Sequence, residues 1–535
     1  MTRHVSPDAH MQQKPGRDTI PVLLATLLLT ATILLAWGHF KPLDQDEVFV
    51  LQTDSVPSLR ALIDVQRHTP ISLDPLFYHL LGHASVNLFG ACAFAVRLPS
   101  LLGYLLMQVC LFSTASRLAS ARAGVIAAAV PALTATLFYG VEARPYGVLL
   151  GLSALILLSW QNALLHQKGH RAPALITLAL ALALALNTHY FAVLLLIPLY
   201  TAELFRSVSV DGAKVRLHMD RAMLLAIACG SAGVVFALPF QKAAGEFRKH
   251  YYNAGGVSLH AVTQSYRALL VNYTTYSMGV QRALGAVLLL LALLLMWCVW
   301  KQFRSPTHVP AAERVFLVVL AALPFFGFLL ARFVTHSIEV RYVLPAIVAI
   351  AILVALSAEP WLRSSRRYAA VLALLLLAIA AAGVERVRDQ RMKQASLLAS
   401  LVVTPQLQAR LLASPAARLY VQNLGFFDEI SPYVPDEVRS RMVLLYSREE
   451  EISWLHHDTA ALTAMHMQHF TSVPTASYED LQQQPGDHLL LLHPDGWEWV
   501  GRALSRDHAN PVELGSALGG ELVLVHFPAR QEQAP

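Results

Sequence analysis

Three carboxylates lie close together directly after the first long apolar run of this sequence. Asp44, Asp46 and Glu47 occur in the segment KPLDQDEVF after the apolar run 19–40, within about one helical turn of the surface at which that run would leave a membrane. A carboxylate in such a place can serve as a general base for a hydroxyl group within hydrogen-bonding reach. The same residues can instead form a solvated acidic patch or supply helix N-terminal charges that the helix dipole favours.

Two arginines stand beside other apolar runs. Arg144 directly precedes the run 145–165, and Arg341 directly precedes the run 342–358. A guanidinium at the membrane boundary can bind a phosphate through paired hydrogen bonds. It can also simply extend toward lipid headgroups, which is common at the ends of membrane spans.

Polar and aromatic residues at similar positions give further candidates, namely His189, Tyr190, Tyr146 and Tyr342. An ionisable side chain at membrane depth is a candidate functional group, although a histidine in a turn is often a hydrogen-bonded structural residue. For the two tyrosines Tyr146 and Tyr342, anchoring at the membrane interface is the alternative.

The composition indicates a membrane protein. Of the 535 residues, 55% are hydrophobic and only 14% are charged, and the mean hydropathy is +0.48, whereas soluble domains carry about 25% charged residues. The net charge of +6 is spread between apolar runs, which does not support nucleic-acid binding. Four scattered cysteines support neither a disulfide framework nor a cysteine-based zinc site.

Apolar runs of spanning length occur nine times, and a tenth run is too long for one span. The nine runs are 19–40, 98–116, 123–141, 145–165, 222–241, 283–300, 315–331, 342–358 and 368–384. We predict that the tenth run, 172–202, forms two helices that turn at 187–190, because the loops richer in Lys and Arg then all lie inside. The sequence thus predicts about 11 transmembrane helices over 19–384, after a cytoplasmic N-terminus at 1–18.

Three segments are then expected outside the membrane. The first outer loop, 41–97, contains two amphipathic stretches, 56–66 and 75–90, which we predict to be interfacial helices above the acidic cluster. The second outer loop is 242–282. The tail, 385–535, alternates strand-like and helix-like stretches and predicts an extracytoplasmic α/β domain. Its histidines His456, His457, His466 and His469 have no fixed ligand spacing and are expected at the surface.

Several short motifs together resemble those of the GT-C superfamily of polyprenyl-phosphate-sugar glycosyltransferases. The group includes the dolichyl-phosphate-mannose protein mannosyltransferases and the bacterial lipid A aminoarabinose transferase. The resemblance is carried by the acidic DE pair, by DPLFYHLL and LFGACAFAVRLPSLL, and by EARPYGVLL, THYF and VRYVLP, in consistent order over about residues 20–385. The family usually has His-Pro-Pro before the amphipathic stretch, whereas here His68 and Asp74 both stand near that place.

The resemblance implies a chemistry and a set of roles. A sugar would pass from a polyprenyl-phosphate donor to a lipid, glycan or protein acceptor, with inversion, at the periplasmic face of the cell inner membrane. Asp46, the first acidic residue of the pair, would be the base, with Asp44 as its rival. Glu47 would orient a neighbour or help hold a divalent cation.

Donor binding would fall to the remaining candidates. Arg144 and Arg341 would bind the donor phosphate, and the other substrate-binding candidates are Tyr146, His189, Tyr190, Tyr342, His68 and Asp74. A transporter or flippase of lipid-linked sugars is the alternative interpretation, although the spans are nearly free of charge and show no internal repeat.

Overall fold

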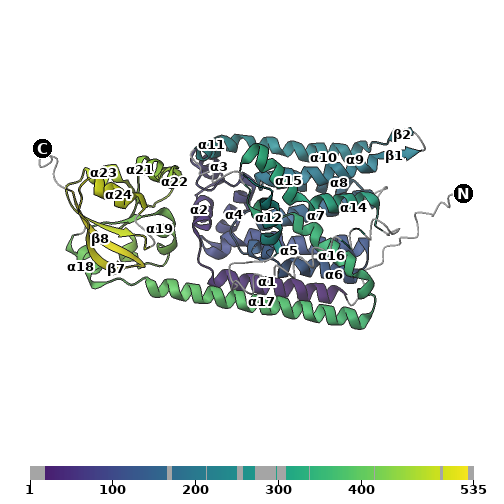
Figure 1. The fold of residues 1–535 in the computed structure, drawn as a ribbon, viewed down its shortest axis with the longest axis horizontal. Coiled ribbons are helices and arrows are strands. Elements are labelled where there is room, and N and C mark those ends of the chain that lie inside the picture. Colours follow the sequence, from purple (N-terminus) through teal and green to yellow (C-terminus); the bar gives the residue numbers. More distant parts are fainter. Residues whose placement is uncertain are drawn as a thin grey trace. The chain divides into compact units, whose positions relative to one another are not determined.

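The computed structural model describes residues 19–165, 171–211, 214–249, 257–270, 297, 300, 309–336, 338–414, 416–494 and 498–527. These residues divide into two compact units (Figure 1). Unit 1 comprises residues 1–38, 97–237 and 255–386, and unit 2 comprises 39–96, 238–254 and 387–535. The predicted N-terminal segment 1–18, most of the predicted span 283–300 and parts of the predicted loop 242–282 lie outside the described residues.

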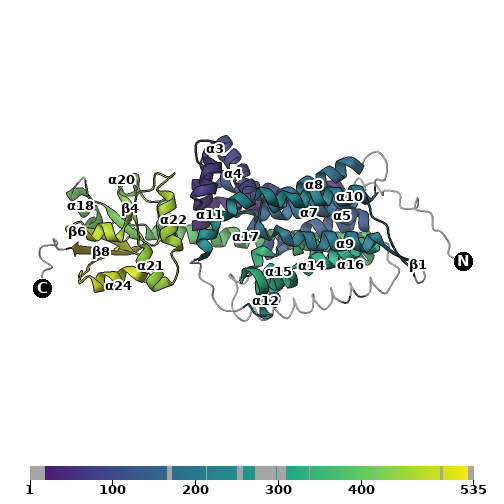
Figure 2. The ribbon, with the colours of Figure 1, turned by 90° about the horizontal axis from the view of Figure 1, so that it is seen from above.

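Unit 1 is built from helices, many of which run side by side in both views (Figures 1 and 2). Its elements are α1 (Thr19–Phe40), α5 (Ala93–Leu118), α6 (Ala121–Ala129), η2 (Val130–Leu133), η3 (Ala135–Gly140), α7 (Tyr146–Leu165), α8 (Arg171–Leu186), η4 (Tyr190–Leu195), α9 (Leu196–Ser207), α10 (Arg221–Ala232), η5 (Gly233–Phe236), α12 (His260–Leu270), α14 (Ala311–Ala321), α15 (Leu323–Leu330), η6 (Ala331–Thr335), η7 (Val340–Tyr342), α16 (Ala346–Leu362) and α17 (Ser365–Ser400). A short hairpin, β1 (Val208–Asp211) with β2 (Lys214–Leu217), joins α9 to α10.

Several of these helices are long and apolar enough to cross a membrane. Among the described residues six helices qualify, or seven when the bent pair α14–α15 is taken as one span, and three shorter apolar helices accompany them. The run 172–202 does form two helical arms, α8 and η4–α9, with the turn at 187–189. The run 123–141 differs from a straight span: Pro131 follows α6, and the chain continues as the two 3-10 segments η2 and η3. The total of 11 spans stays a prediction.

Helices α5 and α7 meet backbone to backbone. A Cβ atom added at Gly147 would lie 2.2 Å from the Ser100 carbonyl oxygen, and one added at Gly103 would lie 2.5 Å from the Gly147 carbonyl oxygen. Small residues permit such close helix crossings in membranes. At the same crossing the Ser100 hydroxyl donates to the Arg144 carbonyl at 2.6 Å. This crossing therefore fixes the backbone of Arg144.

Unit 2 contains a six-stranded sheet in the order β5-β4-β3-β6-β8-β7. Its strands are β3 (Leu419–Gln422), β4 (Met442–Tyr446), β5 (Thr475–Ser477), β6 (Gly486–Leu492), β7 (Val512–Ala517) and β8 (Gly520–Phe527). The first four strands run parallel, and β8 and β7 complete the sheet antiparallel. The α/β domain predicted for the tail is thus present.

Helices cover both faces of this sheet because side chains alternate along each strand. Leu419, Val421 and Leu444 face one apolar core, whereas Tyr420, Val443 and Leu445 face the other. The covering helices are α18 (Pro405–Ala413), α19 (Leu424–Ile430), α20 (Asp436–Arg439), α21 (Arg448–Leu455), α22 (Thr459–Met467), α23 (Tyr478–Gln482) and α24 (Glu498–Arg506). Among the four tail histidines, the surface prediction is wrong for His466, which is buried and bonded to the Pro70 carbonyl at 2.8 Å.

The first outer loop also belongs to unit 2. It forms α2 (Gln45–Asp54), α3 (Leu59–His68) and α4 (Leu76–Phe89), and α11 (Leu238–Lys249) joins them. Phe49 and Ile71 enter the same apolar core as α19 and α22. The sequence analysis grouped the first outer loop with the membrane spans and treated the tail separately. In the structure the first outer loop and the tail belong to the same compact unit, unit 2.

Helix α4 buries a different face from the one its apolar pattern suggests. Tyr78, His79, His83 and Val86 are buried, whereas Leu88 is 76% exposed. Polar residues on the inner face find hydrogen-bond partners in α2, as described below. The apolar side is thereby left available, as expected of an interfacial helix.

Candidate functional site

Asp44 and Glu47 fold the start of α2 through a capping box. The Asp44 Oδ1 atom accepts from the Glu47 amide at 3.0 Å, and the Glu47 carboxylate accepts from the Asp44 amide at 3.2 Å. The Lys41 ammonium contacts both carboxylates, at 2.8 Å and 2.5 Å. Asp44 and Glu47 therefore satisfy otherwise unpaired helix N–H groups, which is the structural interpretation that the sequence left open.

Asp46 differs from these two neighbours. It is the second residue of α2, it is partly exposed, and it is not a member of the capping box. The structure thus separates two carboxylates that hold the helix start from one that the capping box does not use. The role of Asp46 as the base stays a prediction.

Glu47 does not suit a cation site. Its side chain is fully buried, and the carboxylate already binds the Lys41 ammonium and the Asp44 amide. A divalent cation at this carboxylate would have to displace a buried lysine. The expected help of Glu47 in holding a cation therefore does not fit its contacts.

A second group of candidates gathers within unit 1. Three segments that lie far apart in the sequence bring Tyr146, His189 and Tyr342 together: the His189 ring centroid lies 5.5 Å from that of Tyr146 and 5.8 Å from that of Tyr342. Phe191 stacks on Tyr342 at 3.9 Å. The sequence named three of these four residues.

Both candidate arginines contact this aromatic row. The Arg144 guanidinium lies 5.6 Å from the Tyr146 ring and donates to its hydroxyl at 3.4 Å. The Arg341 guanidinium lies 5.8 Å from the Tyr342 ring. Arg341 also interacts with Tyr146 and Arg144, so both guanidinium groups lie beside the row.

The two arginines are close enough to influence each other electrostatically. Arg341 interacts with Arg144 as a like charge and with Glu339 as an opposite charge. Its Nε atom is buried, with no hydrogen-bond partner among the described residues. Two adjacent, half-buried guanidinium groups beside tyrosine hydroxyls can bind a group that carries two negative charges.

The other three candidates are Tyr190 in unit 1 and His68 and Asp74 in unit 2. Tyr190 begins η4 and is half-buried. His68 is exposed on α3 and pairs with Asp64 at 3.1 Å. Asp74 is buried in unit 2, where its carboxylate accepts from the Ser72 hydroxyl at 3.5 Å.

Unit 2 also contains a chain of hydrogen-bonded buried side chains that the sequence did not predict. The His79 Nδ1 atom lies 2.7 Å from the Asp54 carboxylate, and its Nε2 atom lies 3.1 Å from the Ser72 hydroxyl. Burial raises the pKa of Asp54 against the opposing effect of His79. The three residues have no common spacing, so no sequence motif could have revealed the chain.

The hydrogen-bond chain of Asp54, His79 and Ser72 depends on a glycine. A Cβ atom at Gly82 would lie 1.8 Å from the Asp54 Oδ2 atom. The absence of a side chain at Gly82 lets α2 and α4 approach closely enough for Asp54 to reach His79. The chain thereby fixes two helices of the unit that carries Asp46.

Part of the chain matches a known protein family. Residues 74–234 match the family model described as dolichyl-phosphate-mannose-protein mannosyltransferase. Among curated proteins no sequence match is found.

Solved structures resemble the chain over nearly its whole length. The structure of ArnT from Cupriavidus metallidurans in the apo state matches with a TM-score of 0.57 at 14% identity, covering 95% of this chain and 98% of that one. The same protein bound to undecaprenyl phosphate matches with a TM-score of 0.56 at 14% identity, covering 94% and 98%. The chain therefore shares the fold of these structures, including the C-terminal sheet domain, and its residues 74–234 match the mannosyltransferase family model.

Proposed function

We propose that this protein transfers one sugar, with inversion, from a polyprenyl-phosphate-linked donor to an acceptor at the periplasmic face of the inner membrane. The observation that carries the proposal is the convergence of Arg144 and Arg341 on one row of aromatic side chains in unit 1. Two cations at the ends of apolar helices suit the phosphate of a membrane lipid. The similar ArnT structure with bound undecaprenyl phosphate supports this donor class.

The leaving group explains why so few catalytic groups are needed. The departing polyprenyl phosphate is a phosphate monoester whose second pKa is roughly 6, so it leaves without a general acid. Guanidinium groups would stabilise the negative charge that grows on its oxygen as the glycosidic bond breaks. We assign this role to Arg144 and Arg341, with Tyr146 beside the Arg144 guanidinium.

Asp46 would act on the acceptor. As the acceptor oxygen forms its bond to the anomeric carbon, its proton would pass to the Asp46 carboxylate, and the bonding electrons would leave with the phosphate. Attack from the side opposite the phosphate gives inversion. Lys41, Asp44 and Glu47 would hold the start of α2 so that Asp46 keeps its position.

The test replaces Asp46 by Asn in full-length protein in lipid nanodiscs. The substrates would be a panel of radiolabelled polyprenyl-phosphate hexoses and pentoses with an envelope extract as the acceptor source. D46N should lose at least 10³-fold in transfer, toward the upper end of the typical contribution of a general base of about 10²–10⁴. Asp64, an exposed carboxylate of the same unit, provides the matched control, and D64N should keep full activity.

Two outcomes would decide against the proposal. Full transfer by D46N would remove Asp46 as the base, and D44N would then be tested in its place. Movement of labelled donor across the membrane of sealed proteoliposomes, without its consumption, would favour a flippase.

Donor binding is tested separately through Arg144. R144A should raise the donor Michaelis constant by about 10- to 100-fold, since a charge-assisted hydrogen bond contributes about 1.5–3 kcal/mol. An unchanged dependence on donor concentration would return Arg144 to a role in membrane anchoring.

A further inference from the structure

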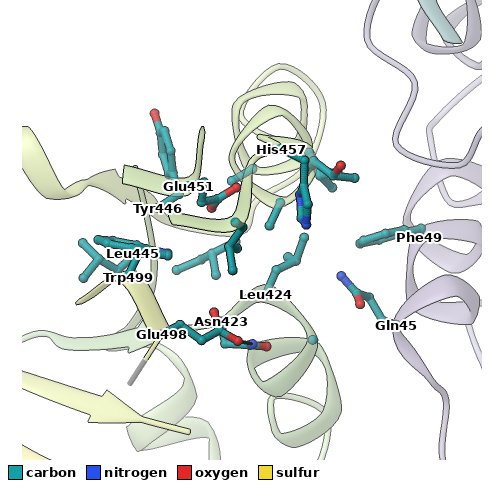
Figure 3. Close-up of a pocket in the computed structure, with 17 residues that line it drawn as sticks. Gln45, Phe49, Asn423, Leu424, Leu445, Tyr446, Glu451, His457, Glu498 and Trp499 are labelled. Atoms are coloured by element: carbon teal, nitrogen blue, oxygen red, sulfur yellow. Dashed lines mark hydrogen bonds between the residues drawn. The ribbon is translucent and has the colours of Figure 1, made fainter. Parts of the chain in front are cut away.

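A cavity of about 370 Å³ lies in unit 2 at the carboxyl ends of the parallel strands (Figure 3). Strand β3 lies between β4 and β6, so the chain leaves β3 toward β4 and later returns to its other side. This is a switch point in strand order, where open α/β sheets hold their ligands. Residues that follow β3, the end of β4 and the start of α24 line the cavity.

One carboxylate at this cavity is held rigidly. Glu498 accepts from the Gln422 amide at 3.0 Å and from the Asn423 amide at 2.8 Å. Asn423 and Glu498 both have positive φ angles, 78° and 46°, which non-glycine residues adopt rarely. Such backbone strain occurs most often at binding sites, where the surrounding structure holds it in place.

Other polar groups of the cavity offer hydrogen bonds of both kinds. Glu451 is 2% exposed and accepts from the Ala461 amide at 2.9 Å. Burial raises the pKa of Glu451 to about 8, so at neutral pH the carboxyl group retains its proton and can also donate. The Nδ1 atom of His457 is buried, with no hydrogen-bond partner in the described part of the chain.

Apolar walls complete the lining. Phe49, Leu424 and Trp499 surround the polar groups, and Figure 3 shows the His457 ring directed into the space between Leu424 and Phe49. The nearby carboxyl groups disfavour an anionic ligand. A neutral sugar ring presents hydroxyl donors and acceptors around its edge and C–H groups on its faces, and so matches this lining.

The cavity wall also includes the residue that directly precedes the proposed catalytic carboxylate in the chain. Gln45 and Phe49 of α2 contribute to its wall, and Gln45 directly precedes Asp46 in the chain. Their Cα atoms are therefore about 3.8 Å apart. Asp46 itself does not line the cavity, because successive side chains of a helix point about 100° apart. A ligand in the cavity would therefore reach Asp46 only through a further unit.

We propose that this cavity binds a neutral sugar unit of the acceptor, which makes the acceptor a glycan. The inference rests on the proposed function and narrows it from the three acceptor classes, lipid, glycan and protein, to one. The unit bound in the cavity would orient the acceptor, and a hydroxyl group on the neighbouring unit would face Asp46.

The test measures sugar binding by full-length protein in nanodiscs without any donor. Saturation-transfer NMR would compare methyl α-glucoside, methyl α-mannoside and methyl α-galactoside with glucuronate as the anionic probe. At least one neutral glycoside should bind, and glucuronate should bind more weakly. E498Q and H457A should each weaken that binding at least tenfold.

Matched controls come from the same domain. Glu429 and His469 are exposed and do not line the cavity, so E429Q and H469A should bind as the wild type does. H457A leaves the Glu498 hydrogen bonds intact, so it remains informative if E498Q misfolds. Unchanged thermal unfolding of the variants would confirm that binding, rather than folding, has changed.

Three results would overturn the inference: no neutral glycoside binds, glucuronate binds best, or neither cavity variant alters binding. These results are distinguishable from failure of the proposed function. Binding is measured without donor, whereas failure of the proposed function appears as unimpaired transfer by D46N.

Discussion

Replacing Glu451 by Gln should remove a specific pH dependence from the stability of the α/β domain. The Glu451 carboxyl is 2% exposed, and burial together with the nearby Asp458 and Glu498 raises its pKa to about 8 from an ordinary value of 4.5. The folded protein therefore keeps a proton that the unfolded chain releases. This contribution to stability is fully present below about pH 4.5 and is lost as the pH rises through about 8.

The size of the effect follows from the two pKa values. Between pH 5 and pH 7 this single group should lower the free energy of unfolding by about 2–3 kcal/mol, or on the order of 100-fold in the folding equilibrium. Gln has nearly the same shape, can still accept from the Ala461 amide and does not titrate. The free energy of unfolding of E451Q should therefore fall by that much less than the wild-type value between pH 5 and pH 7.

Hydrogen exchange of the β4 amides in full-length protein would measure this difference. Protection factors corrected for the intrinsic exchange rate would be compared from pH 5 to pH 8 for wild type, E451Q and the control E429Q. Wild type and E429Q should lose protection together as the pH rises. Equal slopes in E451Q and wild type, or a slope of opposite sign, would refute the reasoning.

Three other changes test the arrangement of the candidate sites. G147V should destabilise the protein by about 1–3 kcal/mol through overpacking and should weaken donor binding, as measured by thermal unfolding and donor titration. The control is G245A, whose added Cβ meets nothing within 4 Å. Equal stability of the two variants would contradict the close crossing. G82A should shift the Asp54 carboxylate and lower the unfolding temperature in the same assay, and a temperature equal to that of wild type would mean that α2 and α4 are less tightly packed than described. R341Q should raise the donor Michaelis constant by about 10- to 100-fold, whereas the exposed Arg332 should tolerate the change to Gln, and similar constants for both variants would exclude Arg341 from donor binding.

The sequence predicted the elements that depend on local patterns. The apolar runs predicted helices, and the positions of Lys and Arg favoured a turn at 187–190, where α8 ends at Leu186 and η4 begins at Tyr190. The strand-like runs of the tail gave β3, β4, β6 and β8, while the short β5 and the exposed β7 were not recognised. Both have weak apolar patterns, because β5 has three residues and β7 is largely exposed.

Site residues were predictable where a motif carried them. Arg144, His189 and Arg341 were named from the sequence, and the structure groups them in one row, although their roles remain predictions. The Asp54–His79–Ser72 chain and the cavity around Glu498 depend on contacts between distant segments. Such contacts follow from tertiary packing, which hydrophobic periodicity does not encode.

The crossing of α5 and α7 has an evolutionary consequence. Because main chain meets main chain there, no neighbouring side chain can be shortened to make room for a larger residue at position 147. A substitution would therefore move the backbone that carries Arg144. Among natural homologues, glycine at position 147 and arginine at position 144 should therefore be inherited as a pair, and lineages that lose one should have abandoned the other.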